Sequence, residues 1–236
     1  MQSRMTLKAV LFDFNGVIIN DEPIHRQLID DIMIAENLRP QPGEYRRVCL
    51  GKSDRAALSQ LLAGRGRMVT DNYLNQLMFR KAQAYQVQVA AMAELPIYGG
   101  VVEAIAKLQA ANLKLAIVSG ALRGEIEIIL NRAGLAEYFA TIVAGDDITT
   151  SKPEPDGYLL AVERLNQLYP QLHLQPSECL AIEDTLAGIA AAKRAGIPVA
   201  GVTHTYPFHV LHRQANWTVD YFADLELEWL ERFYAG

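Results

Sequence analysis

The sequence predicts an α/β fold with a parallel sheet, covered by helices on both faces, and a block of helices inserted after the first strand. Continuous apolar segments, rather than alternating ones, are typical of strands buried on both faces. Helical patterns alternate with such segments from about residue 97 to 205, as in a doubly wound sheet. We therefore expect strands at KAVLF (8–12), KLAIV (114–118), TIVAG (141–145), CLAIE (179–183) and VAGV (199–202).

The segments between these strands carry helical patterns. In GGVVEAIAKLQAAN, the apolar residues on one helical face are Val101, Val102, Ile105 and Leu108, and Asn112 can end the helix. In DTLAGIAAAKRAG, apolar residues recur at helical spacing, and Gly196 follows as a stop. The tail DLELEWLERFYAG is expected to form a short amphipathic helix that docks on the core.

Residues 19–95 break this alternation, because they contain no apolar segment of the strand type. They carry three helical patterns instead: PIHRQLIDDIMIAENL, SDRAALSQLLAG and DNYLNQLMFRKAQAYQVQVAAMAE. ELPIYGG, with one proline and two glycines, then forms the linker back to the sheet. We expect two domains: a Rossmann-like core from residues 1–18 and 96–236, and a helical domain from residues 19–95.

Composition excludes several classes of protein. A net charge of −5 argues against a nucleic-acid partner. The sequence contains no stretch of about 18 consecutive apolar residues, so it predicts no membrane span. The N-terminal apolar segment is too short for a signal peptide. We therefore expect a cytoplasmic protein, a monomer or dimer, in which Cys49 and Cys179 are reduced rather than joined.

Polar residues follow several of the predicted strands directly. In an open α/β sheet, ligands bind beyond the carboxyl ends of the strands, so these side chains should converge. Carboxylates with room for water suit Mg²⁺, whereas a hydroxyl, a lysine and exposed backbone amides suit a phosphate. An aspartate held between a metal and a lysine can attack phosphorus. The residues at these ends are Asp13, Asn15, Ser119, Gly120, Lys152, Glu183 and Asp184.

The same residues lie in four motifs that occur in order along nearly the whole chain: DFNGV, VSG, SKPEPD and IEDTLAGIAAAKRAG. With these motifs the sequence resembles the haloacid dehalogenase-like superfamily. It is most similar to the phosphatase and β-phosphoglucomutase-like branch, which carries a helical cap domain after the first strand. The resemblance implies a Rossmann-like core, a cap formed by the inserted helices, and Mg²⁺-dependent chemistry on a small phosphorylated metabolite.

The resemblance also implies a role for each motif residue. Asp13 would be the nucleophile that becomes an aspartyl-phosphate. Ser119, with Gly120 beside it, and Lys152 would hold the phosphoryl oxygens. Asp13, the backbone carbonyl of Asn15, Glu183 and Asp184 would bind Mg²⁺. In the cap, the candidate substrate contacts are His25, Arg55 and Lys81.

Position 15 departs from the family pattern. Most family phosphatases and mutases carry a second aspartate there, which acts as a general acid and base worth about 10²–10⁴-fold in rate. An amide cannot exchange a proton in this way. Four explanations remain open: a slow phosphatase or one suited to good leaving groups, a binding protein without turnover, a deliberate replacement of Asp, and deamidation at Asn15-Gly16.

We therefore predict Mg²⁺-dependent hydrolysis of a small phosphate monoester through an aspartyl-phosphate, slowed by the amide at position 15. The alternative is a catalytically weakened protein that binds a phosphate ester. A sugar phosphomutase is less favoured, because a mutase must move a proton at position 15. A dehalogenase is disfavoured by its different first motif and by the acidic pair Glu183 and Asp184.

Overall fold

The computed structural model describes residues 6–235 and contains one six-stranded parallel sheet. The strand order β3-β2-β1-β4-β5-β6 places the first strand at the centre, with chain crossovers on both sides of it. This confirms the predicted Rossmann-like α/β core. The strands are β1 (Ala9–Phe12), β2 (Lys114–Val118), β3 (Thr141–Val143), β4 (Cys179–Glu183), β5 (Val199–Val202) and β6 (Trp217–Val219).

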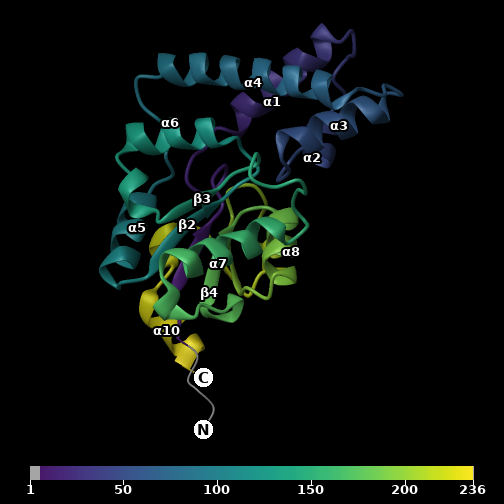
Figure 1. The fold of residues 1–236 in the computed structure, drawn as a ribbon. Coiled ribbons are helices and arrows are strands. Elements are labelled where there is room, and N and C mark those ends of the chain that lie inside the picture. The colour runs from purple at the N-terminus through teal and green to yellow at the C-terminus, as the bar shows by residue number, and fades with distance from the viewer. Residues whose placement is uncertain (1–5, 236) are drawn as a thin grey trace.

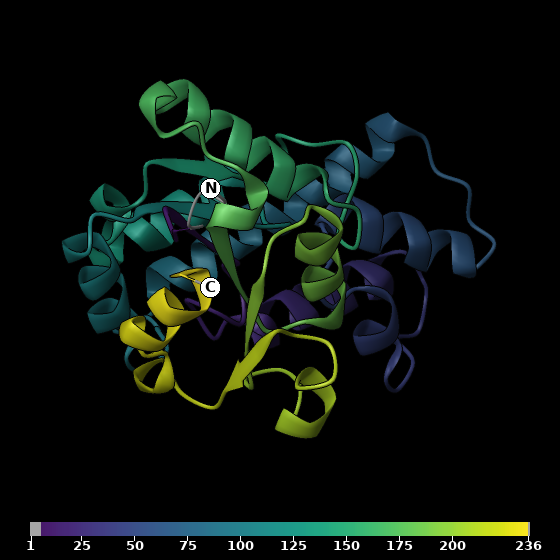
Figure 2. The ribbon, with the colours of Figure 1, turned by 90° about the horizontal axis from the view of Figure 1, so that it is seen from below.

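Helices cover both faces of the sheet because alternate strand residues point to opposite sides. Val10 and Phe12 of β1 pack in one apolar cluster with α5 (Val101–Ala110), α6 (Arg123–Ala133) and α10 (Leu227–Ala235). Ala9 and Leu11 pack in a second cluster with α7 (Asp156–Leu168) and α8 (Leu186–Arg194). Figure 2 shows α7, in green, and α10, in yellow, on opposite sides of the strands. Shorter helical elements are α9 (Phe208–Leu211) and turns at Ala136–Tyr138, Pro170–Leu172, Pro176–Glu178 and Phe222–Asp224.

The inserted segment forms four helices, which Figure 1 shows at the end of the molecule opposite helix α10. They have an apolar core of their own, which includes Met33, Leu58 and Leu77. Ile19 and Ile97 form an isolated bridge, so the two connections between insert and sheet lie side by side. The helices are α1 (Glu22–Ala35), α2 (Glu44–Val48), α3 (Asp54–Gly64) and α4 (Asp71–Ala91).

Three details of the sheet differ from the sequence-based expectation. The first strand begins at Ala9 rather than at residue 8. The third strand ends at Val143 rather than at residue 145. A Cβ at Gly145 would lie 2.2 Å from the carbonyl oxygen of Gly120, so the chain here bends tightly against the neighbouring loop instead of continuing as a strand. The edge strand β6, at Trp217–Val219, was not predicted, because three residues carry too little pattern.

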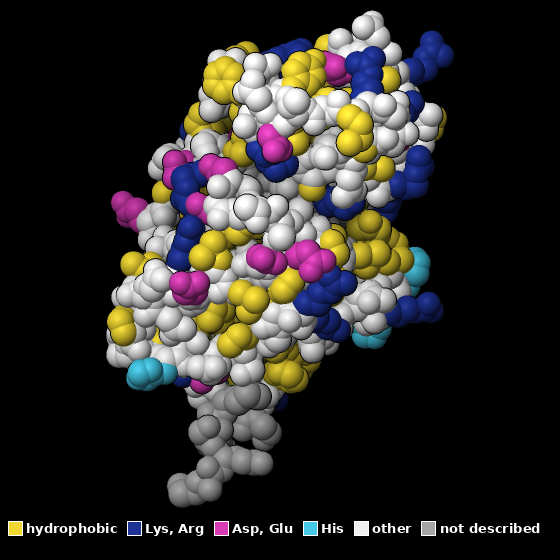
Figure 3. Space-filling model, turned by 45° about the vertical axis from the view of Figure 1, so that its right-hand side comes forward, with side chains coloured by type: hydrophobic (Ala, Val, Ile, Leu, Met, Phe, Trp, Pro, Cys, Tyr) yellow, Lys and Arg dark blue, Asp and Glu magenta, His cyan; other side chains and the backbone are white. Residues whose placement is uncertain are grey.

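The described surface carries charges of both signs. Figure 3 shows acidic and basic side chains interspersed over one face of the molecule. Within residues 6–235, no helix is both long and apolar enough to cross a bilayer. Cys49 and Cys179 are both buried and unpaired.

Candidate active site

Three neighbouring strands end at the same edge of the sheet and place the motif residues together. The Asp13 amide donates to the Ile182 carbonyl at 2.9 Å, which extends the pairing of β1 with β4 by one step. The Ser119 amide donates to the Val143 carbonyl at 2.9 Å and extends β2 in the same way. The residues that follow these strands therefore lie side by side at the carboxyl edge of the sheet, as expected for parallel strands.

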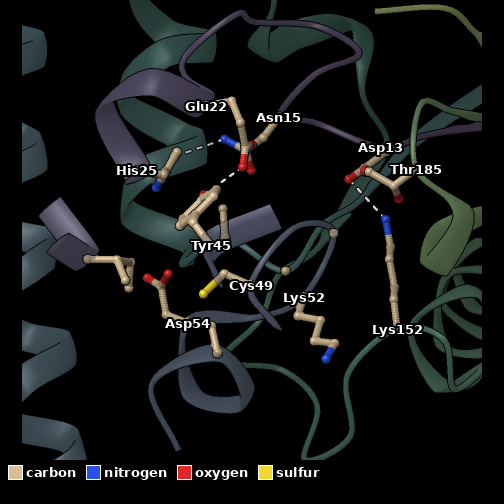
Figure 4. A pocket seen from close by; sticks show the side chains of 15 residues that line it. Asp13, Asn15, Glu22, His25, Tyr45, Cys49, Lys52, Asp54, Lys152 and Thr185 are labelled. Carbon is tan, nitrogen blue, oxygen red and sulfur yellow. Dashed lines mark hydrogen bonds and ion pairs between the residues drawn. The ribbon is translucent and has the colours of Figure 1, made fainter. Parts of the chain in front are cut away.

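Asp13, Glu183 and Asp184 form a buried acidic cluster in which carboxylate oxygens from all three residues lie within 4.8 Å of one another. Lys152 is the cation in contact with it: its Nζ lies 2.9 Å from Asp13 Oδ1 and 2.6 Å from Glu183 Oε1. Figure 4 shows Lys152 directed at Asp13. Three carboxylates against one ammonium leave a negative excess, which a divalent cation would neutralise.

The two aspartates of this cluster have strongly perturbed acidities. Burial, together with the charge of Glu183, raises the pKa of Asp13 to about 7, although Lys152 acts in the opposite direction. Burial and the charges of Asp13 and Glu183 hold the pKa of Asp184 well above its ordinary range. Burial acts to lower the pKa of Lys152, but its two carboxylate partners outweigh burial and hold that pKa above its usual value. Lys152 is therefore a permanent cation.

Glu183 and Asp184 differ in how their oxygens are used. Glu183 Oε1 accepts hydrogen bonds from Lys152 and from Tyr158 Oη at 2.7 Å, and Oε2 accepts from Thr185 at 3.2 Å. Asp184 Oδ2 accepts from Thr205, but its Oδ1 is buried and has no hydrogen-bond partner. An orphaned buried carboxylate oxygen is costly unless a cation binds it. The residues present therefore fit a hard divalent cation such as Mg²⁺.

Glycines allow close approaches on both sides of the cluster. Gly16 has a positive φ of 78°, and a Cβ there would meet Asp184 Oδ2 at 2.0 Å, so the turn after β1 lies directly against the end of β4. A Cβ at Gly120 would lie 2.9 Å from the amide nitrogen of Ser53, so this loop meets the helical insert. Beside it, the Ser119 hydroxyl is buried and accepts a hydrogen bond from the Ala121 amide at 3.0 Å.

The Asn15 side chain binds groups of the helical insert. Its Nδ2 donates to Asp21 Oδ1 at 2.9 Å and to Asp21 Oδ2 at 3.0 Å, and lies 3.1 Å from His25 Nε2. Asp21 is fully buried and also accepts from Tyr85 Oη at 2.5 Å. Sequence reasoning missed Asp21. Asp21 could have been found from its position four residues before His25 at the start of a helix, because side chains at this spacing lie on the same helical face.

The three candidates in the insert have different positions. His25 lines the pocket in front of Asp13, as Figure 4 shows. Lys81 is buried behind it, with Nζ 2.8 Å from His25 Nδ1, 2.7 Å from Asp54 Oδ2 and 3.4 Å from Glu125 Oε1. Arg55 binds Asp71 at 3.1 Å on the surface of the insert and does not line the pocket. Further polar residues that were not named individually as site candidates also line the pocket: Glu22, Tyr45, Lys52, Asp54 and Thr185.

Comparisons with known proteins show the family of this chain. A family model described as haloacid dehalogenase-like hydrolase matches residues 7–196. The phosphorylated carbohydrates phosphatase of Thermotoga maritima is 30% identical over 202 residues, which cover 84% of this chain and 87% of that protein. Protein CbbY of Rhodobacter capsulatus is 29% identical over 220 residues, which cover 91% and 93% of the two chains. The structure of β-phosphoglucomutase from Clostridium difficile has the same fold, with a TM-score of 0.84 over 97% of each chain at 21% identity. The chain belongs to the haloacid dehalogenase-like hydrolase family.

Proposed function

We propose that this protein hydrolyses a small phosphate monoester, with Asp13 as the nucleophile and Mg²⁺ as the cofactor. The observation that carries the proposal is the contact of Asp13 with Lys152, beside an Asp184 oxygen that has no protein partner. The name of the Thermotoga relative, a phosphorylated carbohydrates phosphatase, supports a phosphorylated metabolite as substrate.

The Asp13 carboxylate is held from one side. The Phe14 amide donates to Oδ1 at 2.7 Å, and Lys152 Nζ contacts the same oxygen, whereas Oδ2 has no donor among the described residues. We propose that one Asp13 oxygen bonds to phosphorus while the bond from phosphorus to the leaving oxygen breaks, and that the leaving oxygen takes its proton from water because Asn15 cannot give one. This forms the aspartyl-phosphate, which water then hydrolyses.

The neighbouring residues position the phosphate and reduce charge repulsion. Lys152, Ser119 and the loop amide at Gly120 would bind the phosphoryl oxygens, because an ammonium, a hydroxyl and an amide all donate to phosphate. Asp13, Asp184 and the backbone carbonyl of Asn15 would hold Mg²⁺, with Glu183 either joining them or fixing Lys152. When bound, Mg²⁺ supplies the positive charge that allows an anionic nucleophile to approach an anionic phosphate.

A phosphate-ester binding protein with little turnover is the second candidate. The observation that favours it is the amide at position 15, whose Nδ2 is directed at Asp21 and which has no proton to give to a leaving group. A sugar phosphomutase is less favoured for the same reason.

One assay separates these functions. Phosphate release from p-nitrophenyl phosphate and from a panel of sugar phosphates is measured with and without MgCl₂. Mg²⁺-dependent release that is abolished by Asp13→Asn supports the phosphatase. Binding of sugar phosphates without any release supports the binding protein, and release that Asp13→Asn does not alter overturns the nucleophile assignment.

A further inference from the structure

The helical insert gives its side of the pocket a negative character. Glu22 and Asp54 line the pocket with carboxylates that lie opposite the Asp13 end, as Figure 4 shows. Both come from helix starts, Glu22 from the first turn of α1 and Asp54 from the first turn of α3. Tyr45 Oη donates to Glu22 Oε1 at 2.5 Å and holds that carboxylate in place.

The cations near these carboxylates are already paired. Lys81 lies between Asp54 and Glu125, and His25 lies 3.2 Å from Asp21 Oδ2. Even if His25 is protonated, two cationic groups meet four carboxylates: Glu22, Asp54, Glu125 and Asp21.

Lys52 is the lysine of the insert that lines the pocket, whereas Lys81 does not. Its ammonium donates to Gln60 Oε1 at 2.7 Å on the exposed face of α3. Figure 4 shows its amino end directed away from Glu22 and His25. Arg55 lies outside the pocket and is bound to Asp71.

From this arrangement we infer that the insert selects phosphate monoesters whose leaving group carries hydroxyl donors and no second anion. The inference rests on the proposed phosphatase function and narrows its substrate class. Hydroxyl groups can donate to Glu22 and Asp54, whereas a second phosphate or a carboxylate would meet like charges there, because Lys81 and His25 are already paired and the Lys52 ammonium is directed away from Glu22. Polyol and sugar monophosphates fit this pocket, and bisphosphates and phosphorylated carboxylic acids do not.

The test uses pairs of esters that differ at one group. Glycerol 3-phosphate is compared with 3-phosphoglycerate, and 2-hydroxyethyl phosphate with 2-phosphoglycolate. We expect kcat/KM to favour the hydroxyl member of each pair by at least about tenfold, a typical effect of one unfavourable polar contact in a binding site. Equal or greater turnover of the anionic members overturns the inference.

Variants of Glu22 and Asp54 test whether these two carboxylates cause the preference for hydroxyl-bearing esters. Glu22→Gln keeps an acceptor for Tyr45, and Asp54→Asn keeps a polar residue at the start of α3. Each should reduce the discrimination several-fold, with the larger change for Asp54→Asn because it also frees Lys81. Asp71→Asn removes an equal charge from the insert at a side chain that is 92% exposed, outside the pocket, and should leave the ratio unchanged. Discrimination that survives both pocket variants overturns the assignment, and thermal unfolding confirms that each variant is folded.

Calorimetric binding of the same four esters to the unaltered chain, with MgCl₂, separates this inference from the proposed function. If no ester is hydrolysed, the phosphatase proposal fails, and the ratio of dissociation constants within each pair then tests the selectivity alone. Tighter binding of the hydroxyl members supports the inferred selectivity. Tighter binding of the anionic members, or no binding of any ester, overturns it.

Discussion

The side-chain amide of Asn15 donates to both oxygens of the Asp21 carboxylate, at 2.9 and 3.0 Å. A carboxylate is thus present next to position 15 although position 15 itself holds an amide. The two residues form a complementary donor and acceptor pair, and because Asp21 is fully buried, leaving its carboxylate without a donor is costly. Position 15 can therefore not be altered without affecting Asp21.

The first prediction concerns exchange of this pair. Asn15→Asp alone places two carboxylates in contact, so we expect the free energy of unfolding to fall by about 1–3 kcal/mol and turnover to rise little. The double variant Asn15→Asp/Asp21→Asn restores one donor and one acceptor and puts the carboxylate at position 15. We expect it to regain stability and to hydrolyse esters with poor leaving groups about 10²-fold faster or more. Urea unfolding and phosphate release measure both effects; equal stability of the single and double variants would count against the pairing.

The second prediction concerns Asp13. Asp13→Asn keeps the size of the side chain but removes the nucleophile, so we expect phosphate release to fall by at least about 10³-fold. Binding of a phosphate ester should persist, because Ser119 and Lys152 remain. Release is measured with p-nitrophenyl phosphate and binding by calorimetry. Intact-mass spectra of acid-quenched protein should show the phosphoryl adduct in the unaltered chain and not in the variant.

The third prediction concerns Mg²⁺ and the acidic cluster. Binding of a cation to the folded state alone stabilises it by about 2.7 kcal/mol at 100 times the dissociation constant. We therefore expect MgCl₂ to raise the melting temperature, and Asp184→Asn to remove most of this rise because it replaces the orphaned oxygen. Asp71→Asn, far from the cluster, serves as the control. A melting temperature that MgCl₂ leaves unchanged in the unaltered chain would contradict the metal assignment.

The sheet and the residues at its edge could be predicted from local signals. β1 and β4 are short, apolar along most of their length, and end in or are followed by carboxylates. The topology of a parallel sheet brings the ends of neighbouring strands together independently of side-chain packing. The four motifs then placed Asp13 and Lys152, which lie in contact in the structure.

The interior of the helical insert could not be predicted in this way. The contacts of Lys81 with Asp54 and Glu125 join residues 27 and 44 positions apart, and Glu125 lies in helix α6 of the core, so these contacts depend on how the insert packs within itself and against the core. The same holds for Asp21 and Tyr85. Arg55 was expected to contact the substrate as a cation of the insert, but it lies in helix α3 and binds Asp71, and its neighbour Asp54 lines the pocket instead.

The fourth prediction concerns pH and Asp21. Burial acts to raise the pKa of Asp21, but the charge of His25 and hydrogen bonds from His25, Tyr85 and Asn15 outweigh burial and hold that pKa below 3.8. Because the folded pKa lies below the unfolded value, ionised Asp21 stabilises the fold above about pH 4. That contribution is lost as the pH falls through the folded pKa. We expect the stability difference between the unaltered chain and Asp21→Asn to shrink on acidification from pH 6 to pH 3, measured by urea unfolding; a constant difference would argue against an ionised Asp21.

The fifth prediction concerns the close approach of helix α8 to Glu183. A Cβ at Gly188 would lie 1.9–2.0 Å from the three atoms of the Glu183 carboxylate. Gly188→Ala must therefore displace Glu183 from Lys152 and Tyr158, which bind it at 2.6 and 2.7 Å. We expect a loss of stability of about 1–3 kcal/mol, as for a buried polar group that loses its partners, and reduced turnover because Lys152 is no longer held.

Gly124→Ala is the matched control: it lies in helix α6, where the nearest atom to an added Cβ is 3.8 Å away. That variant should gain up to about 1 kcal/mol from lower backbone entropy in the unfolded chain. Circular dichroism melting and phosphate release measure both variants, and equal behaviour of the two would mean that helix α8 does not hold Glu183 against Lys152.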